Sequence, residues 1–462
     1  MLFSSIPFLY YFLPLVLIIY FAVPFKFKNF VLLIASLIFY AWGEPRYVVI
    51  MVVSVLIGFI LGIQIEKFRG RTLGKALTAL SVVICLGFLL YFKYVDFFIE
   101  SFNSAFGLSI PLLKVALPIG ISFYTFQILS YTIDVYRGDT KAQKNIITLG
   151  AYIAMFPQLI AGPIVRYSDV AFQLTERKHS FEKASKGIRR FIIGLSKKVL
   201  IANTLGQYCN LFTNTASPSV LYSWLYAASF ALQIYYDFSG YSDMAIGLGH
   251  ILGFDFIENF NYPFISRSVT EFWRRWHMSL GSWFRDYLYI PLGGNRVSKP
   301  RFIFNIFVVW MTTGFWHGAD WNFIFWGLYF AVLLLIEKFF LLKLLKKNAV
   351  ISHIYTIFVV LISFVIFNAT DMNIAVMQLS SMFKTIDVPF VNSETLFFAG
   401  SYLVLLILAV IGATPIVKNI FTKIKSHKAF VVLEPIFLAV MLIIVTASLV
   451  SGSFNPFLYF RF

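Results

Sequence analysis

Apolar runs of about 20 residues recur from one end of this 462-residue chain to the other, and each is long enough to cross a bilayer as a helix. Hydrophobic residues make up 59% of the sequence, and only 13% of the residues are charged. A soluble domain would have roughly a quarter of its residues charged. We therefore expect an all-α, multi-pass membrane protein rather than a globular domain with one anchor.

The predicted architecture is a transmembrane helical bundle of about 10–12 spans, including re-entrant pieces, with additional interfacial helices. Three apolar segments, 115–137, 146–165 and 302–336, contain Pro, Gly or ionisable residues that are expected to interrupt them. Irregular backbone is tolerated at membrane depth only where protein or a water-filled cavity covers it. Uninterrupted spans are expected near 5–24, 29–43, 47–64, 76–93, 199–213, 219–250, 351–368, 395–416 and 430–451.

The net charge of +17 arises mostly from Lys and Arg in short segments between the apolar runs. This distribution is typical of loops that face the cytoplasm, and it argues against nucleic acid as the partner. Segments 176–198 and 255–301 are therefore expected on the cytoplasmic side, and the C-terminal tail outside. Segment 176–198 is expected to be an interfacial helix, with a docking surface for an acidic donor or carrier as the alternative.

His317 lies in GFWHGADWNFIFWG, between apolar runs that place it deep in the membrane. Ionisable groups at that depth are costly, so they are functional candidates. A neutral imidazole in such a place can act as a general base near neutral pH. The alternative is a histidine whose hydrogen bonds are satisfied within the protein core.

His277 lies 40 residues upstream, in EFWRRWHMSLG. Trp273 precedes it by four residues, so the two are expected to share a helix face. Arg274 and Arg275 carry guanidinium groups, which suit the recognition of phosphate or carboxylate. The alternative is an aromatic and basic helix at the membrane interface.

Three further polar residues are candidates of second rank. Asp237 and Asp243 lie in the apolar span 219–250, where they would either form a buried polar network or orient a catalytic group and line a polar tunnel. Asn322 follows His317 closely. The sequence contains no HxxxH, HExxH, GxSxG or P-loop motif, so no metal site and no serine nucleophile are predicted. Two histidines with one aspartate remain the weaker metal-binding alternative.

Several segments resemble the membrane-bound O-acyltransferases (MBOAT). They are RRWHMSLGSWFRDYLYIPLGGNR (274–296), GFWHGADWNFIFWG (314–327), FPQLIAGPIVRY (156–167) and YYDFSGYSDMAIGLG (235–249). The resemblance is to the bacterial branch of alginate O-acetyltransferases, peptidoglycan O-acetyltransferases and D-alanyl transfer proteins. It implies a single integral membrane domain over 1–462, with N-terminal helices (1–93), a catalytic core (94–340) and C-terminal helices with an extracytoplasmic tail (341–462).

The resemblance also implies roles for individual residues. His317 matches the catalytic histidine of the family, and His277 matches a second polar position. An acyl group would pass from a cytoplasmic thioester, such as acetyl-coenzyme A, through a tunnel to an acceptor outside, with no bound cofactor. A separate extracytoplasmic, esterase-like partner of the SGNH type would complete the transfer. PFLYFRF (456–462) resembles the aromatic ending of bacterial members, in which Tyr459 would be a transient acyl carrier; the alternative is an aromatic membrane anchor.

We therefore expect an O-acyltransferase in the bacterial cytoplasmic membrane that acetylates an extracytoplasmic polysaccharide, such as alginate, another exopolysaccharide or peptidoglycan. His317 would deprotonate the acceptor hydroxyl, and His277 would help to position donor or acceptor. D-alanyl transfer to teichoic acid is the alternative within the enzyme class. A transporter or flippase is the alternative from another class, because broken polar helices near mid-membrane are also typical of transporters.

Overall fold

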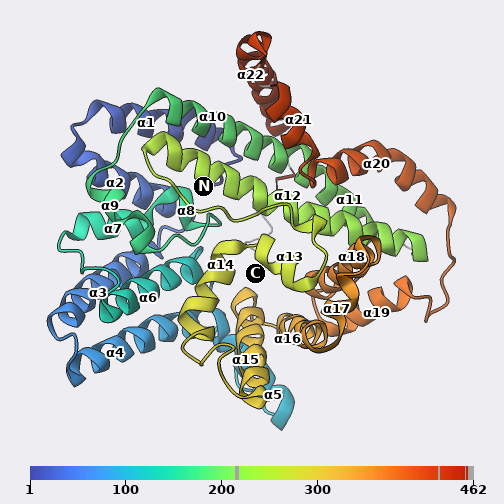
Figure 1. Ribbon diagram of the computed structural model, residues 1–462, viewed down its shortest axis with the longest axis horizontal. Coiled ribbons are helices and arrows are strands. Elements are labelled where there is room, and N and C mark those ends of the chain that lie inside the picture. Colours follow the sequence, from blue (N-terminus) through green and yellow to red (C-terminus); the bar gives the residue numbers. More distant parts are fainter. Residues whose placement is uncertain (214–217, 425–426, 453, 456–462) are drawn as a thin grey trace. The chain divides into compact units, whose positions relative to one another are not determined.

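The computed structural model describes residues 1–462 except 214–217, 425–426, 453 and 456–462. Its regular structure is helical, and no strand occurs among the described residues (Figure 1). This confirms the prediction of an all-α fold. The prediction for Tyr459 lies outside the described residues.

Six helical segments within the described ranges are long and apolar enough to cross a membrane. Such segments confirm a multi-pass membrane protein. The remaining passes of the predicted bundle would fall on helices that are shorter or less apolar than these six, so the full number of spans stays a prediction. The six segments are Phe25–Gly43, Val48–Lys67, Thr72–Phe106, Ala349–Asn368, Ser393–Gly412 and Ala429–Ser451.

The chain divides into two compact units, and the first comprises Met1–Phe191 with Tyr241–Ile257. Within this unit α3, α4 and α6 pack against one another, and α2 packs against α7. The prediction of one membrane domain in three parts stays a prediction. The helical elements of this unit are η1 (Phe8–Phe12), α1 (Leu13–Ala22), α2 (Phe25–Gly43), α3 (Val48–Lys67), α4 (Thr72–Leu89), η2 (Leu90–Tyr94), α5 (Val95–Phe106), α6 (Ile121–Arg137), α7 (Ile146–Ala154), α8 (Phe156–Leu159) and α9 (Tyr167–Thr175).

Two of the three predicted interruptions can be compared with helices of this unit. The segment 146–165 is interrupted as predicted, because α7 ends at Ala154 and the short α8 follows. In 115–137 the irregular part is confined to the beginning. Gly120 adopts a left-handed conformation with φ of 76°, and α6 then runs without a break to Arg137. Pro118 and Gly120 therefore precede the helix instead of breaking it.

The second unit comprises Ile192–Gly240 with Glu258–Phe462, and α10 (Phe181–Ser196) and α12 (Val220–Leu252) contribute to both units. The other elements of this unit are η3 (Lys197–Ala202), α11 (Asn203–Thr213), η4 (Pro263–Ile265), α13 (Val269–Arg275), α14 (Met278–Phe284), η5 (Arg285–Tyr289), α15 (Lys299–His317), α16 (Trp321–Ile336), η6 (Glu337–Leu341), α17 (Leu342–Leu345), α18 (Ala349–Asn368), α19 (Met372–Met382), α20 (Ser393–Gly412), α21 (Ile416–Ile424) and α22 (Lys428–Ser451).

Helices α15 and α16 form a hairpin whose backbones touch. A Cβ placed on Gly314 would lie 2.2 Å from the Phe323 carbonyl oxygen, and one placed on Gly327 would lie 2.3 Å from the Trp310 carbonyl oxygen. Small residues at such a crossing allow two membrane helices to approach closely. The segment 302–336 is thus two helices joined by a turn at Gly318–Asp320, as the predicted interruption requires.

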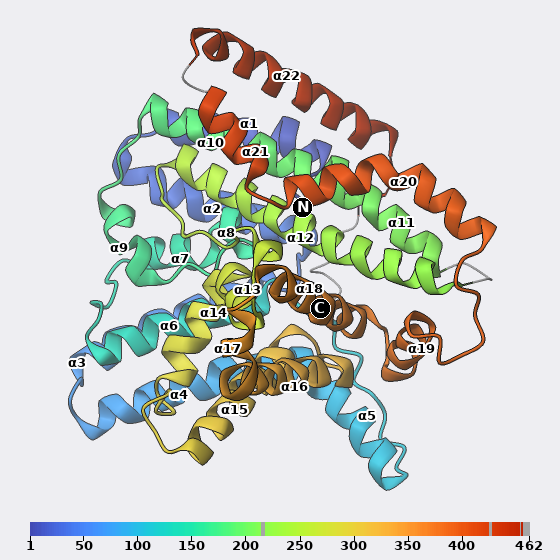
Figure 2. The same ribbon diagram turned by 45° about the vertical axis from the view of Figure 1, so that its right-hand side comes forward.

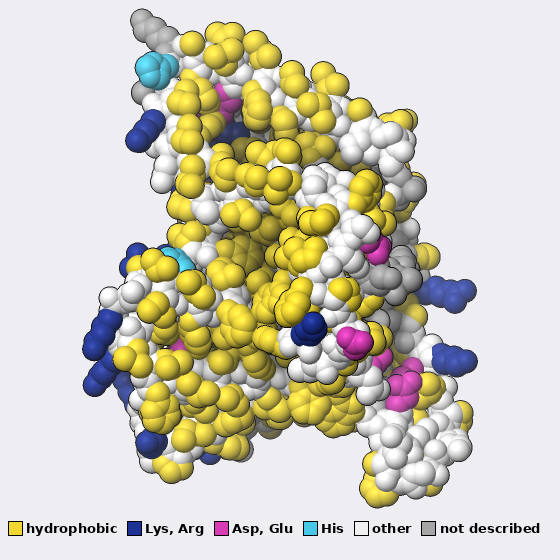
Figure 3. Space-filling view, turned by 90° about the vertical axis from the view of Figure 1, so that its right-hand side faces the viewer, with side chains coloured by type: hydrophobic (Ala, Val, Ile, Leu, Met, Phe, Trp, Pro, Cys, Tyr) yellow, Lys and Arg dark blue, Asp and Glu magenta, His cyan; other side chains and the backbone are white. Residues whose placement is uncertain are grey.

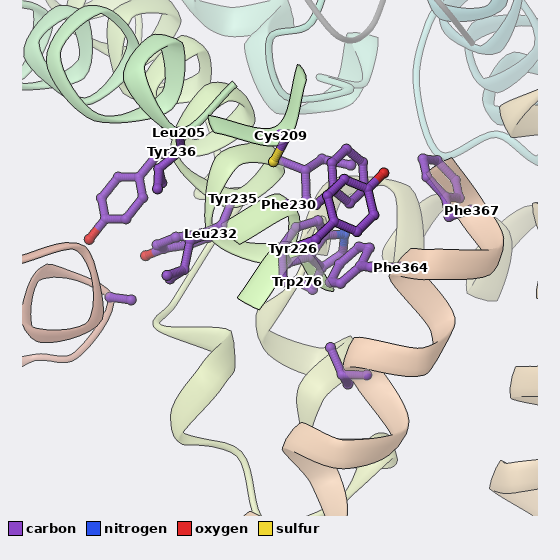
Figure 4. Close-up of a cluster of buried hydrophobic side chains, with 14 of the residues drawn as sticks. Leu205, Cys209, Tyr226, Phe230, Leu232, Tyr235, Tyr236, Trp276, Phe364 and Phe367 are labelled. Atoms are coloured by element: carbon purple, nitrogen blue, oxygen red, sulfur yellow. The ribbon is translucent and has the colours of Figure 1, made fainter. Parts of the chain in front are cut away.

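A largely aromatic core fills the second unit. Trp276 lies in it with Tyr226, Phe230 and Phe364, and its ring centroid is 5.3 Å from that of Phe364 (Figure 4). Helix α13, which leads to this tryptophan, is capped by a buried carboxylate. Glu337 accepts hydrogen bonds from the backbone N–H groups of the first two residues of α13.

The outermost helices of the second unit expose apolar surface, as lipid-facing helices do. Only 11% of the apolar window of α20 and 6% of that of α22 is buried (Figure 2). Apolar side chains cover most of the face shown in Figure 3, and few charged side chains interrupt it. In a membrane such surface is solvated by lipid and needs no protein partner.

Candidate active site

His277 lies at a break between two short helices of the second unit. Helix α13 ends at Arg275, Trp276 is extended, and His277 has φ 44° and ψ 53° before α14 begins at Met278. This left-handed conformation is uncommon for a residue with a side chain. The expectation that Trp273 and His277 share a helix face is therefore wrong, because the helix stops between them.

Hydrogen bonds from the segment around Asn259 stabilise this break. Its carbonyl oxygen accepts from the N–H of Met278 at 2.9 Å, and Asn261 donates its N–H to the Arg275 carbonyl oxygen at 2.9 Å. The side-chain oxygen of Asn259 lies 3.0 Å from Nδ1 of His277. The residues on both sides of His277 are thus fixed by one extended segment that follows α12.

The imidazole of His277 is buried, with 1% of its surface exposed. Its ring meets Phe238 edge to face at a centroid distance of 4.6 Å, and that of Trp316 at 6.2 Å. Burial lowers the pKa of His277 well below its usual value, and a charge on His317 lowers it further. Burial of this ring therefore favours its neutral form.

His317 is the last residue of α15 and is buried, with 8% exposed. Its ring lies 5.1 Å from Trp316, 5.1 Å from Trp326 and 5.4 Å from Phe367, measured between centroids. These three rings come from α15, α16 and the end of α18, and they surround the imidazole with aromatic side chains. The position predicted for a general base is therefore buried and lined by aromatic rings.

The two histidines meet at Trp316, although 40 residues separate them in sequence. The tryptophan ring contacts both imidazoles, and the two histidines are close enough for a charge on one to affect the other. Phe238 of α12 borders the same place on the His277 side. The structure therefore brings the two leading candidates into one buried site inside the second unit.

Asn322 lies in the first turn of α16 and is buried, with 1% exposed. Its side-chain amide donates to the carbonyl oxygen of Ala369 at 2.8 Å, just after α18. Asp320 caps the same helix by accepting from the N–H of Trp321. These bonds fix the turn that follows His317, which suits an orienting role for Asn322.

Asp237 and Asp243 have different partners in different units. Asp237 forms a buried ion pair with Lys198 at 2.7 Å, and Lys198 also donates to Asn203 at 2.9 Å. Asp243 belongs to the first unit and pairs with Arg190 at 2.9 Å. Asp237 therefore belongs to a buried polar network in the unit that holds the histidines, and Asp243 belongs to another network.

The two arginines that precede His277 do not join it. Arg275 pairs with Glu271 at 2.9 Å and donates to the Asn261 carbonyl oxygen. Arg274 is exposed on the same short helix. Arg275 therefore contacts Glu271 and Asn261, and Arg274 is exposed while the imidazole is buried.

Among the described residues, no group of three or more His, Cys, Asp or Glu could hold a metal ion. The residue that sequence reasoning missed is Asn259, which is fully buried. Asn259 stands in the segment FIENFNYPF (256–264), and nothing in that local pattern distinguishes it from Asn261. Its partner His277 lies 18 residues further on, so no helical or strand spacing connects them.

These features define a multi-pass helical membrane protein with a buried pair of histidines. Residues 142–381, which contain both histidines, match the membrane-bound O-acyltransferase family, MBOAT. The chain belongs to this family and is an O-acyltransferase.

Three relatives illustrate the similarity. A probable alginate O-acetylase AlgI of Azotobacter vinelandii is 41% identical over 83% of this chain and 78% of its own length. A peptidoglycan O-acetyltransferase of Helicobacter pylori is 32% identical over 73% of this chain and 70% of its own length. A teichoic acid D-alanyltransferase of Bacillus subtilis is 34% identical over 48% of this chain and 59% of its own length.

Proposed function

We propose that this protein takes an acetyl group from a cytoplasmic thioester, acetyl-coenzyme A, and moves it across the bacterial cytoplasmic membrane. The acetyl group ends on hydroxyl groups of a polysaccharide outside that membrane. The observation that carries the proposal is the buried pair of His277 and His317 inside the region that matches the family. The names of the relatives with the broadest coverage support acetylation of alginate-like polymers or peptidoglycan. The basic segments that are predicted to face the cytoplasm suit an anionic donor.

In the proposed reaction the neutral imidazole of His317 takes the proton of the acceptor hydroxyl. The hydroxyl oxygen attacks the thioester carbonyl carbon, the new carbon–oxygen bond forms, and the carbon–sulfur bond breaks. The donor leaves as a thiol after receiving the proton from His317. Coenzyme A is a substrate in this scheme and not a resident cofactor.

The remaining candidates take supporting roles in this proposal. His277 positions donor or acceptor beside His317, and Asn322 fixes the turn after the base. Asp237 keeps its helix in place through Lys198. Tyr459 is proposed as a transient acyl carrier, and an extracytoplasmic esterase-like partner of the SGNH type would pass the acetyl group to the polysaccharide.

The decisive test is His317→Ala in the full chain, purified in lipid nanodiscs together with its extracytoplasmic partner and supplied with labelled acetyl-coenzyme A. We expect the rate of acetyl transfer to alginate or peptidoglycan fragments to fall by about 100-fold or more, because the general base is lost. His427→Ala is the matched control, since His427 is exposed at the start of α22 and makes no capping bond there. Wild-type rates in the His317 variant would remove the basis of the proposal.

D-alanyl transfer is the second candidate, supported by the more distant teichoic acid D-alanyltransferase. The same preparation supplied with a D-alanyl-charged carrier protein separates the two. Transfer from that carrier, with none from acetyl-coenzyme A, would replace the acetyl proposal by the D-alanyl one.

A further inference from the structure

The orientation of the Asn259 amide follows from its neighbours. Its assigned oxygen lies 3.3 Å from the backbone nitrogen of Ser279 and 2.8 Å from the Ser279 hydroxyl. A backbone N–H can only donate. If the amide were turned around, its NH₂ group would face that N–H, donor against donor. The atom that faces Ser279 is therefore an acceptor, the amide oxygen.

The same oxygen lies 3.0 Å from Nδ1 of His277. An amide oxygen can only accept, so Nδ1 must carry the proton in this contact. A neutral imidazole has one ring proton. The tautomer that fits has N–H at Nδ1 and a lone pair at Nε2.

The surroundings of His277 favour the neutral imidazole with its proton on Nδ1. Asn259, Ser279 and His277 are each at most 1% exposed. His317 of α15 is the titratable group whose charge acts on His277, and Phe238 of α12, Trp316 of α15 and the Ser279 hydroxyl are uncharged neighbours of the ring. The backbone bonds between the Asn259 segment and the residues around His277 fix the distance between amide and ring.

We propose that Asn259 is a positioning residue that locks His277 as the Nδ1–H tautomer, so that Nε2 acts in the site only as a hydrogen-bond acceptor. This rests on the proposed function and deepens it. His277 then binds a group with a proton to donate, such as the acceptor hydroxyl or an amide N–H of the thioester donor. It cannot donate to the developing oxyanion through Nε2, so that role belongs to another group.

The first experiment reads the tautomer without any assay of activity. Full-length protein labelled with ¹⁵N-histidine is studied by NMR in nanodiscs at pH 7.5, and the His277 signals are assigned by comparison with His277→Asn. We expect a protonated Nδ1 and an unprotonated Nε2, whose ¹⁵N shifts differ strongly. A proton on Nε2 overturns the proposal. If the wild-type chain transfers no acyl group, the proposed function fails while this measurement still stands.

The second experiment uses the pH profile of acetyl transfer. Asn259→Asp keeps the shape and the acceptor oxygens but adds a negative charge, which favours the doubly protonated ring. We expect its acidic limb to move upward by about one pH unit or more, with activity recovering at higher pH. Asn259→Leu should lose about 100-fold at every pH, because the ring is no longer held.

Asn348→Asp is the matched control. Asn348 caps α18 on the exposed surface through the N–H groups of Val350 and Ile351, and aspartate caps equally well. Its profile should superimpose on that of the wild type. An Asn259→Asp profile that also superimposes on the wild type would overturn the proposal, because a purely structural asparagine would leave the acidic limb unmoved. If that variant fails to fold, the tautomer measured in the wild type decides.

Discussion

The contact between Gly314 and α16 allows a quantitative prediction for Gly314→Ala. The added Cβ would lie 2.2 Å from the Phe323 carbonyl oxygen and 3.2 Å from the Cα of Gly327. Ordinary van der Waals contact requires about 3.5 Å, so α15 and α16 must separate by about 1 Å at this point. Both neighbours are backbone, so no side chain can rotate away to make room.

The expected effects on stability and on rate differ in size. Overpacking lowers the free energy of unfolding by about 1–3 kcal/mol, while replacing a helical glycine by alanine raises it by about 1 kcal/mol. The net loss of stability is therefore about 1 kcal/mol. His317 lies three residues further along α15, and a displacement of about 1 Å in a catalytic group can reduce the rate by about 100-fold. We expect a folded protein with little activity.

The assay is the initial rate of thiol release from acetyl-coenzyme A, measured beside the thermal midpoint of the same detergent-purified sample. Gly400→Ala in α20 is the matched control, because nothing lies within 4 Å of the added Cβ. That variant should keep the wild-type rate and melt at the same temperature or slightly higher. If Gly314→Ala behaves like Gly400→Ala in both measurements, the hairpin contact does not determine the position of His317.

Three further variants test the packing around the site by thermal melting of the purified chain. Asp237→Asn should destabilise the protein by about 3–5 kcal/mol, because Lys198 would keep a buried charge without its carboxylate. Replacing Asp237 by Leu and Lys198 by Met together should recover most of that loss. Equal melting temperatures of the single and the double variant would contradict a buried ion pair. Glu337→Ala should cost about 2 kcal/mol, since it leaves two N–H groups at the start of α13 unpaired; an unchanged midpoint would show that water replaces the cap.

Much of the fold could be predicted because membrane insertion depends on local composition. Each long apolar run predicts a helix by itself, and the glycines around His317 indicate an interruption at the place where α15 ends. The burial of His317 follows from the same local pattern. The residues that surround it, such as Phe367 of α18, are distant in sequence and could not be named in advance.

The surroundings of His277 could not be predicted from the local sequence pattern. Helical spacing placed Trp273 and His277 on one face, but the helix ends between them because Asn259 and its neighbours bind the backbone there. Asp237 and Asp243 look equivalent in sequence, six residues apart on one helix. Their partners, Lys198 and Arg190, lie on another part of the chain and assign them to different networks. Such pairings depend on tertiary contacts that a one-dimensional pattern does not contain.

The left-handed backbone of His277, with φ of 44°, restricts which amino acids this position can accept before any chemistry is considered. Glycine, asparagine and aspartate reach this region readily, whereas valine, isoleucine and threonine are strongly disfavoured there. A β-branched substitute would disturb the junction of two helices and could abolish activity for reasons unrelated to the imidazole. Asparagine is therefore the informative replacement in a mutational scan, and natural variation at position 277 should favour residues that tolerate a positive φ.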